Sequence, residues 1–368
     1  MRVLHLINVH QWTGPADYVI KISKHLLDRN NNVLVGFRSF YQGVFKDELL
    51  KNSIPFTEEL KLPRGFKPRI FLQDHFNLKK IITDFSPDII HCHNSFENIH
   101  CTILKNRNSS FKLVRTVYNL KVTKKKPFSR YILNKNDFII SVCSDYKNRL
   151  IKNQKIDEKK IVILNGFVDT DKFSPSTDSS HRQYLTIGMV ARFQEKRGHR
   201  YLIKAFKKLL DNGYSNIRLV LAGRGETLDE MRNLCRELNI ENFVRFPGYV
   251  KEGLPHLLKS FDIFVLLREG SDGTCRAVLE AMASGLPVVT VNRGALTDTV
   301  KQNINGLFIG DKKDVDSLYK NLLKLLNNTQ LRLSMGDNSR QIALQNFSME
   351  QQLKNYYNFY KNISEEKN

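Results

Sequence analysis

The residues with the most evident chemical potential lie between positions 269 and 291. An apolar strand is expected over 261–267, followed by an acidic, glycine-containing loop and then by an amphipathic helix over 275–284. A glycine and a proline end that helix, and a buried strand is expected over 287–291. The acidic loop and the helix N-terminus are therefore predicted to lie together at the carboxyl edge of a parallel sheet, where α/β proteins bind ligands.

The start of this helix offers groups that bind phosphate. Thr274, Cys275 and Arg276 supply backbone amides at the helix start, and the positive end of the helix dipole favours an anion. Glu280, inside the helix, can accept hydrogen bonds from ribose hydroxyls. An anion site beside a carboxylate suits a sugar nucleotide.

The stretch 272–289 resembles the Glu-x7-Glu motif of the family 4 retaining glycosyltransferases of the GT-B fold, also known as glycosyl transferases group 1. The resemblance implies that Asp272 binds sugar hydroxyls, that Gly273 lines the donor site and that Glu280 binds the ribose. The family usually has Glu where Asp272 stands, so Glu269 is a rival for the sugar contact. Its spacing to Glu280 is too long, which favours Asp272.

A second group of donor-binding residues follows the strand expected over 184–192. Arg192 ends this strand, and Lys196 and Arg197 come shortly after it. Two cations about a turn apart beside a strand end can clamp a diphosphate through charge-assisted hydrogen bonds. The segment resembles the family's Gly-Arg-Leu…Lys-Gly element. Arg197 matches the Lys of that element by count and Lys196 by chemistry, so both stay candidates.

Further donor contacts are expected at glycines and at one strand end. Gly14, in the loop after the first strand, lets backbone approach a ligand closely, although it could simply cap a helix. Gly223 ends the strand expected over 218–223 and is expected to border the donor. The segment 243–250 resembles the family's Phe-x-Gly-x-Val strand, which borders the nucleotide base. That resemblance and its continuation add Tyr249, Val250 and Leu254 to the expected donor site.

Histidines end another expected strand. His91 and His93 share one face of this strand, and Cys92 points to the other face, because side chains alternate along a strand. The segment resembles the family's Pro-Asp-x-x-His-x-His strand, which implies that His93 borders the acceptor side. A metal site is the alternative, since His100 and Cys101 are also near in sequence. Their spacing matches no standard zinc pattern, and we expect no metal.

The next strand, over 113–119, ends in Tyr118 and Asn119, which we also expect on the acceptor side. Many family members have His where Tyr118 stands. The Tyr118 hydroxyl could contact the sugar, or the ring could be a packed strand aromatic.

Charge is concentrated in the N-terminal half. Residues 1–172 hold 30 Lys and Arg against 16 Asp and Glu, so they carry +14 of the formal net charge of +21. The densest basic stretch, 121–135, also contains Phe128 and Tyr131. We expect an anionic membrane surface or a lipid-phosphate acceptor rather than nucleic acid, and solvated lysines are the plainer alternative.

Cysteine usage and hydropathy limit the cellular compartment in which the protein is expected. The five cysteines form no CxxC pair, which indicates a reducing environment. We expect neither a signal peptide nor a transmembrane helix. The protein is therefore predicted to be cytoplasmic and peripheral to the cytoplasmic face of the membrane.

The resemblance covers nearly the whole chain and implies an α/β architecture with two Rossmann-like domains facing across a deep cleft. We expect an acceptor-binding domain over 1–172, a nucleotide-sugar-binding domain over 173–346 and a final helix over 347–368 that crosses back to the first domain. That helix places four residues on one face: Leu353, Tyr356, Tyr357 and Tyr360.

The implied reaction moves a hexose or similar sugar from a nucleoside diphosphate to a hydroxyl of a lipid-linked or saccharide acceptor, with retention and without cofactor or divalent metal. Such a step belongs to the synthesis of cell-surface polysaccharide or lipopolysaccharide. The catalytic roles fall to Asp272, Glu280, His93 and Arg192. Two alternatives stay open: a sugar-nucleotide epimerase or hydrolase with the same donor site, and a catalytically silent nucleotide-sugar-binding protein.

Overall fold

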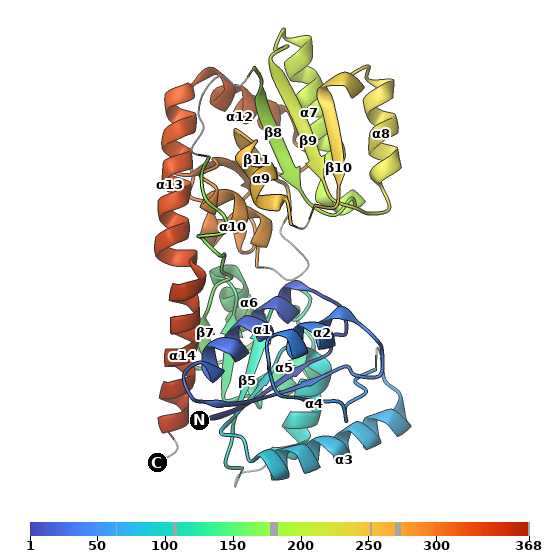
Figure 1. Cartoon of the computed structure of the whole chain (residues 1–368), viewed down its shortest axis with the longest axis vertical. Coiled ribbons are helices and arrows are strands. Elements are labelled where there is room, and N and C mark those ends of the chain that lie inside the picture. Colours follow the sequence, from blue (N-terminus) through green and yellow to red (C-terminus); the bar gives the residue numbers. More distant parts are fainter. Residues whose placement is uncertain (64, 106–108, 177–182, 251, 269–273, 367–368) are drawn as a thin grey trace. The chain divides into compact units, whose positions relative to one another are not determined.

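The structure is a computed structural model that describes residues 1–63, 65–105, 109–176, 183–250, 252–268 and 274–366. The chain forms two compact units, each built on a parallel sheet with helices beside it (Figure 1). Unit 1 comprises Met1–Asn165 and Gln352–Asn368, and unit 2 comprises Gly166–Gln351. Two parallel sheets of this kind confirm the predicted α/β class with two Rossmann-like domains.

Unit 1 contains a seven-stranded sheet in the order β3-β2-β1-β4-β5-β6-β7. Its strands are β1 (Arg2–Ile7), β2 (Asn32–Phe37), β3 (Phe56–Thr57), β4 (Ile89–Cys92), β5 (Lys112–Val117), β6 (Phe138–Ser141) and β7 (Ile161–Ile163). Its helices are α1 (Gly14–Leu27), α2 (Val44–Lys51), α3 (Pro68–Phe85), α4 (Ser95–Leu104), α5 (Pro127–Asn134), α6 (Ser144–Gln154) and most of α14 (Met349–Glu365).

Unit 2 contains a six-stranded sheet in the order β10-β9-β8-β11-β12-β13. Its strands are β8 (Leu185–Val190), β9 (Ile217–Ala222), β10 (Val244–Gly248), β11 (Ile263–Leu266), β12 (Val288–Val291) and β13 (Gly306–Ile309). Its helices are α7 (His199–Asp211), α8 (Leu228–Glu237), α9 (Leu254–Lys259), α10 (Arg276–Ala283), α11 (Leu296–Thr299), α12 (Val315–Asn327) and α13 (Thr329–Phe347), and a short turn, η2 (Glu195–Arg197), precedes α7.

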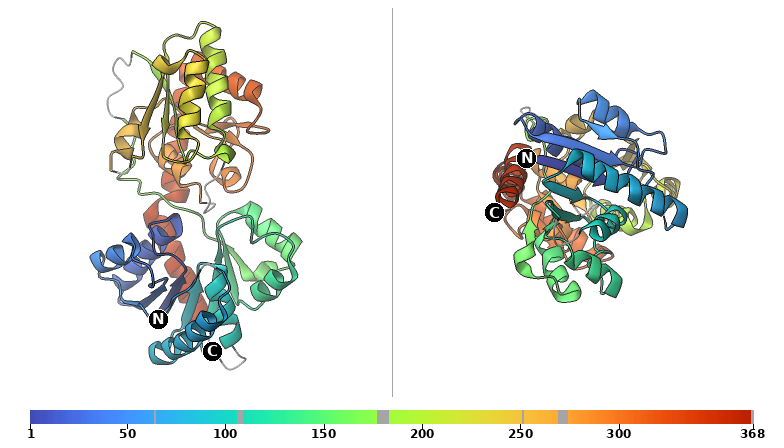
Figure 2. Two further views of the ribbon diagram at one scale, coloured as in Figure 1. Left: turned by 90° about the vertical axis from the view of Figure 1, so that its right-hand side faces the viewer. Right: turned by 90° about the horizontal axis from the view of Figure 1, so that it is seen from below.

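Each sheet has one place where the strand order reverses. β1 lies between β2 and β4, and β8 lies between β9 and β11, so successive connections leave these central strands in opposite directions (Figure 2 gives two further views of both sheets). The crevice outside the carboxyl ends of such strands is the usual ligand site of an open α/β sheet. The topology therefore predicts that ligands bind at the carboxyl ends of β1 and β4 in unit 1, and of β8 and β11 in unit 2.

The interior of unit 1 is formed by strands that are buried on both faces. One side of the sheet packs against the helices α3 and α4 in a single apolar cluster. The strand residues in this cluster include Leu4, Leu6, Ile90 and Cys92. Continuous apolar runs of this kind are what a parallel sheet covered on both faces requires. The other face carries histidines instead. The predicted alternation between Cys92 and its two flanking histidines is confirmed.

Helix α14 attaches to that second face of the sheet through a buried polar contact. The Tyr360 hydroxyl lies 2.6 Å from His91 Nδ1, and the other ring nitrogen of His91 lies 2.6 Å from Thr116 Oγ1. Leu353, Tyr356 and Tyr360 are buried as predicted. Tyr357 is only half-buried, and Phe359 takes the buried position instead, with its ring 5.7 Å from that of Phe138.

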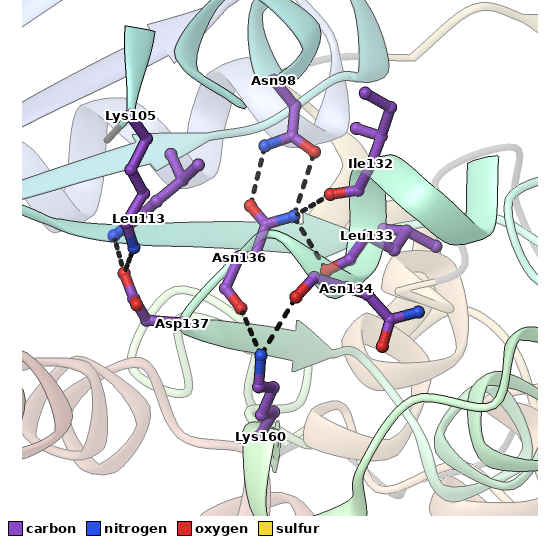
Figure 3. A network of polar contacts seen from close by, with 9 residues as sticks. All are labelled: Asn98, Lys105, Leu113, Ile132, Leu133, Asn134, Asn136, Asp137 and Lys160. Atoms are coloured by element: carbon purple, nitrogen blue, oxygen red, sulfur yellow. Dashed lines mark hydrogen bonds and ion pairs between the residues drawn. The ribbon is translucent and has the colours of Figure 1, made fainter. Parts of the chain in front are cut away.

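A polar network fixes the C-terminal end of α5 (Figure 3). Asn136 is fully buried, donates to the carbonyls of Ile132 and Leu133, and exchanges hydrogen bonds with the side-chain amide of Asn98. Lys160 Nζ donates to the carbonyls of Asn134 and Asn136 at 3.0 and 3.1 Å. These contacts satisfy the carbonyls that a helix end leaves without partners. The network thereby holds α5 against α4 and the sheet.

Among the described residues, no helix has both the length and the apolar character needed to cross a bilayer.

The histidines under α14 form a neutral buried cluster. Burial lowers the pKa of His5 to about 3 and lowers the pKa of His91 and His93 well below the usual value. His5 and His91 are partners in the register of β1 and β4, so they share a face of the sheet. Burial also raises the pKa of the Glu97 carboxyl to about 7.

We predict that Tyr360→Phe destabilises unit 1 by about 1–3 kcal/mol, because His91 loses a buried hydrogen-bond partner while the packing of the ring is kept. Urea unfolding followed by the fluorescence of Trp12, the single tryptophan, reports on this unit. Tyr357→Phe is the matched control on the half-buried side of α14 and should change stability by less than about 0.5 kcal/mol. Equal effects of the two variants would contradict the assigned contact.

We also predict that unit 1 loses stability as the pH falls below about 6.5. A histidine whose folded pKa is depressed contributes stability that is present above its unfolded pKa and lost toward its folded pKa, here down to about 3 for His5. Each such group contributes about 1.4 kcal/mol per pH unit. Glu97 acts in the opposite direction, because its raised pKa favours folding at low pH and that contribution fades as the pH rises through about 7.

The three histidines together lose more unfolding free energy between pH 7.5 and pH 5.5 than the Glu97 carboxyl gains. The urea midpoint of the Trp12 signal should therefore be lower at pH 5.5 than at pH 7.5. His5→Leu, which cannot be charged, should show a weaker pH dependence. The same midpoint at both pH values would mean that the histidines are not held neutral in the folded protein.

Candidate active site

The carboxyl end of β8 carries the first cations of the candidate donor site. Arg192 and Lys196 are exposed, whereas Arg197 is only 6% exposed. Arg197 lies beside the buried His199, whose pKa is lowered to about 4, first by burial and then by the Arg197 charge. Gly198 follows with φ of 87° and is the N-cap of α7. The two sequence candidates for the second phosphate ligand therefore differ sharply in accessibility.

Two further cations gather at the same edge of the unit 2 sheet and were missed from the sequence. Lys312, after β13, donates from Nζ to the carbonyl of Lys196 at 3.1 Å. The pKa of Lys312 is lowered, first by burial and then by the nearby charge of Arg268, which follows β11. A basic residue shortly after a predicted strand was the signal that could have found both. Positive charge is thus concentrated around η2.

Glycines bring three strand ends of this sheet into close contact. Gly223 has φ of 147°, and a Cβ there would lie 1.9 Å from the carbonyl oxygen of Ala191. Its amide donates to the carbonyl of Gly248 at 2.7 Å. The exposed Tyr249 ring next to Gly248 lies 4.8 Å from the Arg224 guanidinium. Gly223 is therefore required for packing, and its contact with a donor stays a prediction.

Helix α10 begins as predicted, one residue after an unusual backbone conformation. Cys275 has φ of 51°, in the left-handed region, and its carbonyl accepts from Val278 and Leu279 at 2.8 and 3.1 Å. Thr274 and Cys275 are buried. Few non-glycine residues adopt this conformation, and it often marks a functional site. Two further predicted donor contacts in this unit are half-buried: Val250, after β10, and Leu254, the first residue of α9.

Glu280 is buried in α10 and held by an ion pair. Arg276 Nε lies 2.8 Å from Glu280 Oε1, one turn along the same helix. This pair orients the carboxylate. Asp272, Gly273 and the rival Glu269 lie outside the described residues, so the sugar contact stays a prediction.

The candidate acceptor side in unit 1 is a chain of buried hydrogen bonds at the ends of β1, β4 and β5. His93 Nε2 lies 3.1 Å from His5 Nδ1, and His93 Nδ1 lies 2.8 Å from the Tyr118 hydroxyl. The structure thus brings together two predicted residues, His93 and Tyr118, through a third, His5, that the sequence did not single out. Asn119 is half-buried and accepts from the amide of Lys121 at 3.1 Å.

The same histidines form the one group of potential metal ligands among the described residues, with ligand atoms of His5, His91 and His93 within 4.8 Å of one another. Both ring nitrogens of His91 and of His93 are already in hydrogen bonds. Their rings lie 4.0 Å apart at 35°, side by side rather than directed at a common point. This geometry favours a hydrogen-bonded cluster over a metal centre.

His100 and Cys101 lie apart from the histidine cluster, and the predicted donor contact of Gly14 stays a prediction. His100 stacks on Phe71 at 4.1 Å, and Cys101 lies in the apolar core, so neither joins the histidine cluster. Gly14 is the first residue of α1, and the Thr13 side chain caps that helix by accepting from Ala16 at 3.3 Å. The alternative interpretation of Gly14 as the cap is therefore wrong.

Comparison with protein families matches the two halves of the chain in succession. Residues 12–172 match Glycosyltransferase Family 4, and residues 171–342 match Glycosyl transferases group 1.

Individual relatives and solved structures agree with this. An uncharacterized glycosyltransferase, MJ1607, of Methanocaldococcus jannaschii is 31% identical over 173 residues, which are 47% of this chain and 43% of the relative, so the chain spans less than half of that protein. The UDP-Gal:alpha-D-GlcNAc-diphosphoundecaprenol alpha-1,3-galactosyltransferase of Escherichia coli is 25% identical over 74% of this chain and 75% of its own length.

Among solved structures, Anabaena Alr3699/HepE in complex with UDP superposes with a TM-score of 0.80 at 19% identity, covering 98% of this chain and 100% of that chain. A likeness at this identity supports the fold. Together with the successive family matches, it shows that this chain belongs to the glycosyltransferases of group 1 and family 4, which have the GT-B fold.

Proposed function

We propose that this glycosyltransferase moves a hexose or similar sugar from a nucleoside diphosphate to a hydroxyl of a lipid-linked or saccharide acceptor, with retention at the anomeric carbon, in the synthesis of cell-surface polysaccharide. The observation that carries the proposal is the set of cations and helix amides at the switch point of the unit 2 sheet. The Escherichia coli relative, named for a UDP-Gal donor and a diphosphoundecaprenol-linked acceptor, supports it, as does the Anabaena structure with UDP.

The physical basis is charge that develops on the leaving diphosphate. As the bond between sugar and phosphate breaks, negative charge grows on the phosphate oxygens, and fixed cations stabilise it more in the transition state than in the ground state. Arg192 and Lys196 are exposed at the end of β8, and Lys312 anchors the turn that carries Lys196. Accessibility favours Lys196 over the buried Arg197 as the second phosphate ligand.

The remaining roles follow from α10. Its first amides would bind the distal phosphate, and Glu280, oriented by Arg276, would accept hydrogen bonds from the ribose. Asp272 would bind sugar hydroxyls. In this proposal the leaving phosphate takes the proton of the acceptor hydroxyl as the new bond forms on the same face of the sugar. The reaction would then need neither a protein nucleophile nor a divalent metal.

The acceptor is proposed to bind in unit 1 beside His93, Tyr118 and Asn119. Tyr118 is 5% exposed and its hydroxyl contacts His93, so any sugar contact of this ring would use the small part of its surface that stays exposed. Donor turnover measured with and without an acceptor separates the two alternatives: a hydrolase or epimerase turns over without acceptor, and a silent binding protein does not turn over at all.

Membrane attachment is the second part of the proposal, and α5 carries it. Phe128 and Tyr131 are 64% and 59% exposed on this helix, and Lys124, Lys125 and Lys126 before it are exposed as well. Exposed aromatic rings among lysines suit the interface of an anionic bilayer. The network around Asn136 holds α5 in place, so these rings are displayed on a fixed helix.

We predict that Arg192→Ala lowers turnover by a factor of about 100 or more, as expected for the loss of one preorganised donor. The donor is first chosen by a thermal-shift screen of nucleoside diphosphate sugars, since a ligand that binds the folded protein raises its stability. Arg218→Ala, at the opposite end of β9, is the control and should keep activity within a factor of about 3. Normal activity of Arg192→Ala would refute the donor-site assignment.

We also predict that the protein sediments with anionic phosphatidylglycerol vesicles at low salt and is released as salt rises. Replacing Lys124, Lys125 and Lys126 by Ser should weaken this binding. The control variant replaces Lys204, Lys207 and Lys208 on α7, which removes the same charge from unit 2, and should bind almost as well as the parent. Equal losses in both variants would mean that net charge alone attracts the protein.

A further inference from the structure

An arginine at the edge of the unit 1 sheet has no place in the roles described so far. The register of β1 and β2 ends at the pair Ile7 and Phe37, and Asn8 and Arg38 come directly after it. Arg38 therefore lies at the carboxyl end of β2, beside the switch point between β1 and β4. This is the edge at which unit 1 is expected to bind its ligand.

Arg38 is buried without a polar partner. It is 5% exposed, its Nε is fully buried without a hydrogen-bond partner, and no ion pair or hydrogen bond of the terminal nitrogens is present in the structure as described. Arg115 and Arg332, which are equally buried, both donate to backbone carbonyls. A buried cation without partners is unfavourable, and such groups are normally paired. The exception at Arg38 calls for an anion from outside the chain.

The side chain of Arg38 is held in place by packing contacts with neighbouring residues. The guanidinium carbon of Arg38 lies over the Tyr41 ring, 4.2 Å from its centre. The Tyr41 ring in turn lies 5.5 Å from that of His10, in the loop after β1. Gly43 permits this arrangement, because a Cβ there would lie 2.0 Å from the carbonyl oxygen of His10.

The contact with Tyr41 leaves the hydrogen-bond donors of Arg38 available, because no acceptor for them occurs in the structure as described. A guanidinium carries five N–H donors that lie in its own plane. The in-plane fork matches two oxygens of a phosphate, and burial strengthens such a pair. Tyr41 itself is 43% exposed, so the ring that covers Arg38 borders solvent.

We propose that Arg38 binds a phosphate group of the acceptor substrate. The inference rests on the proposed function, because it assumes that unit 1 holds the acceptor. The shared chemistry is a phosphoester or diphosphate, carried either by a lipid or by a water-soluble sugar phosphate. Arg38 is thus a specificity-determining residue that selects a phosphorylated acceptor over a neutral glycan.

Binding of inorganic pyrophosphate tests the site directly, without any turnover. Saturating UDP is present to occupy the donor site, and affinity is read from the thermal shift as pyrophosphate is titrated. Arg38→Gln should weaken pyrophosphate binding at least about tenfold, and Arg38→Lys, which keeps the charge but not the fork, should weaken it less. Arg29→Gln is the control, because Arg29 also lies over a tyrosine ring in unit 1, that of Tyr357.

Unchanged pyrophosphate binding in Arg38→Gln would overturn the proposal and leave Arg38 as a support for Tyr41. Equal stabilisation of the parent by malonate at the same ionic strength would overturn the choice of phosphate. If Arg38→Gln does not fold, the comparison of Arg38→Lys with the parent decides in the same way.

Kinetics then identifies the source of the phosphate. Arg38→Gln should raise the acceptor KM at least about tenfold for a phosphorylated acceptor and leave the donor KM unchanged. One assay uses a polyprenyl-diphosphate sugar in detergent micelles and the other a water-soluble sugar phosphate, so the acceptor that loses affinity names the source. A raised donor KM would instead place Arg38 in the donor site and refute the proposal. Loss of pyrophosphate binding in a protein that transfers no sugar would contradict the proposed function and leave the anion site standing.

Discussion

A parallel sheet that is buried on both faces leaves its strands little room for chemistry except at their ends. In this chain the strand interiors are filled by residues such as Val3, Leu4, Phe264 and Val289, which are fully buried. Polar side chains that could act on a ligand therefore follow the last residue of a strand. Arg192 after β8, Arg268 after β11 and Arg38 after β2 all obey this constraint. It is the reason that, within each sheet, residues far apart in sequence lie at the same edge.

The two units use that edge in electrostatically different ways. In unit 2 the cations are exposed or partly desolvated, and Glu280 is compensated by Arg276, so the site presents a net positive field to an incoming diphosphate. In unit 1 the polar groups are deeply buried, and the histidines are held neutral by burial. A neutral cluster of hydrogen-bonded side chains orients hydroxyl groups without attracting ions. Arg38 is the exception in unit 1.

Much of the fold could be predicted from the sequence because apolar runs and their punctuation carry the information. The helix expected over 275–284 is observed as Arg276–Ala283, with the flanking residues as caps. The alternation around Cys92 followed directly from strand geometry. The final helix was harder to predict. Phe359 rather than Tyr357 is buried, because which of these aromatic residues faces the sheet depends on what lies beneath, here Phe138.

The candidate site was less accessible to sequence reasoning where it depends on burial. His5 looks like an ordinary polar residue in a strand, and only the pairing of β1 with β4 places it against His93. From the sequence alone, Arg38 would be interpreted as a solvated cation, and only its low exposure and its lack of partners indicate a binding role. Lys312 is far from Lys196 in sequence and meets it only through the sheet. Such relations are properties of the three-dimensional arrangement, and no local pattern encodes them.

The membership of α14 in unit 1 has a consequence for the order of folding during synthesis. Domains usually fold in the order in which they leave the ribosome. Here unit 2 is one continuous segment, so it has been synthesised completely before the residues from Gln352 onward appear. Until then His91 lacks Tyr360, and the part of the first sheet that α14 covers stays exposed. The first unit to be translated is therefore the last that can complete its core, and its nascent form is the stage at which this chain most needs chaperones.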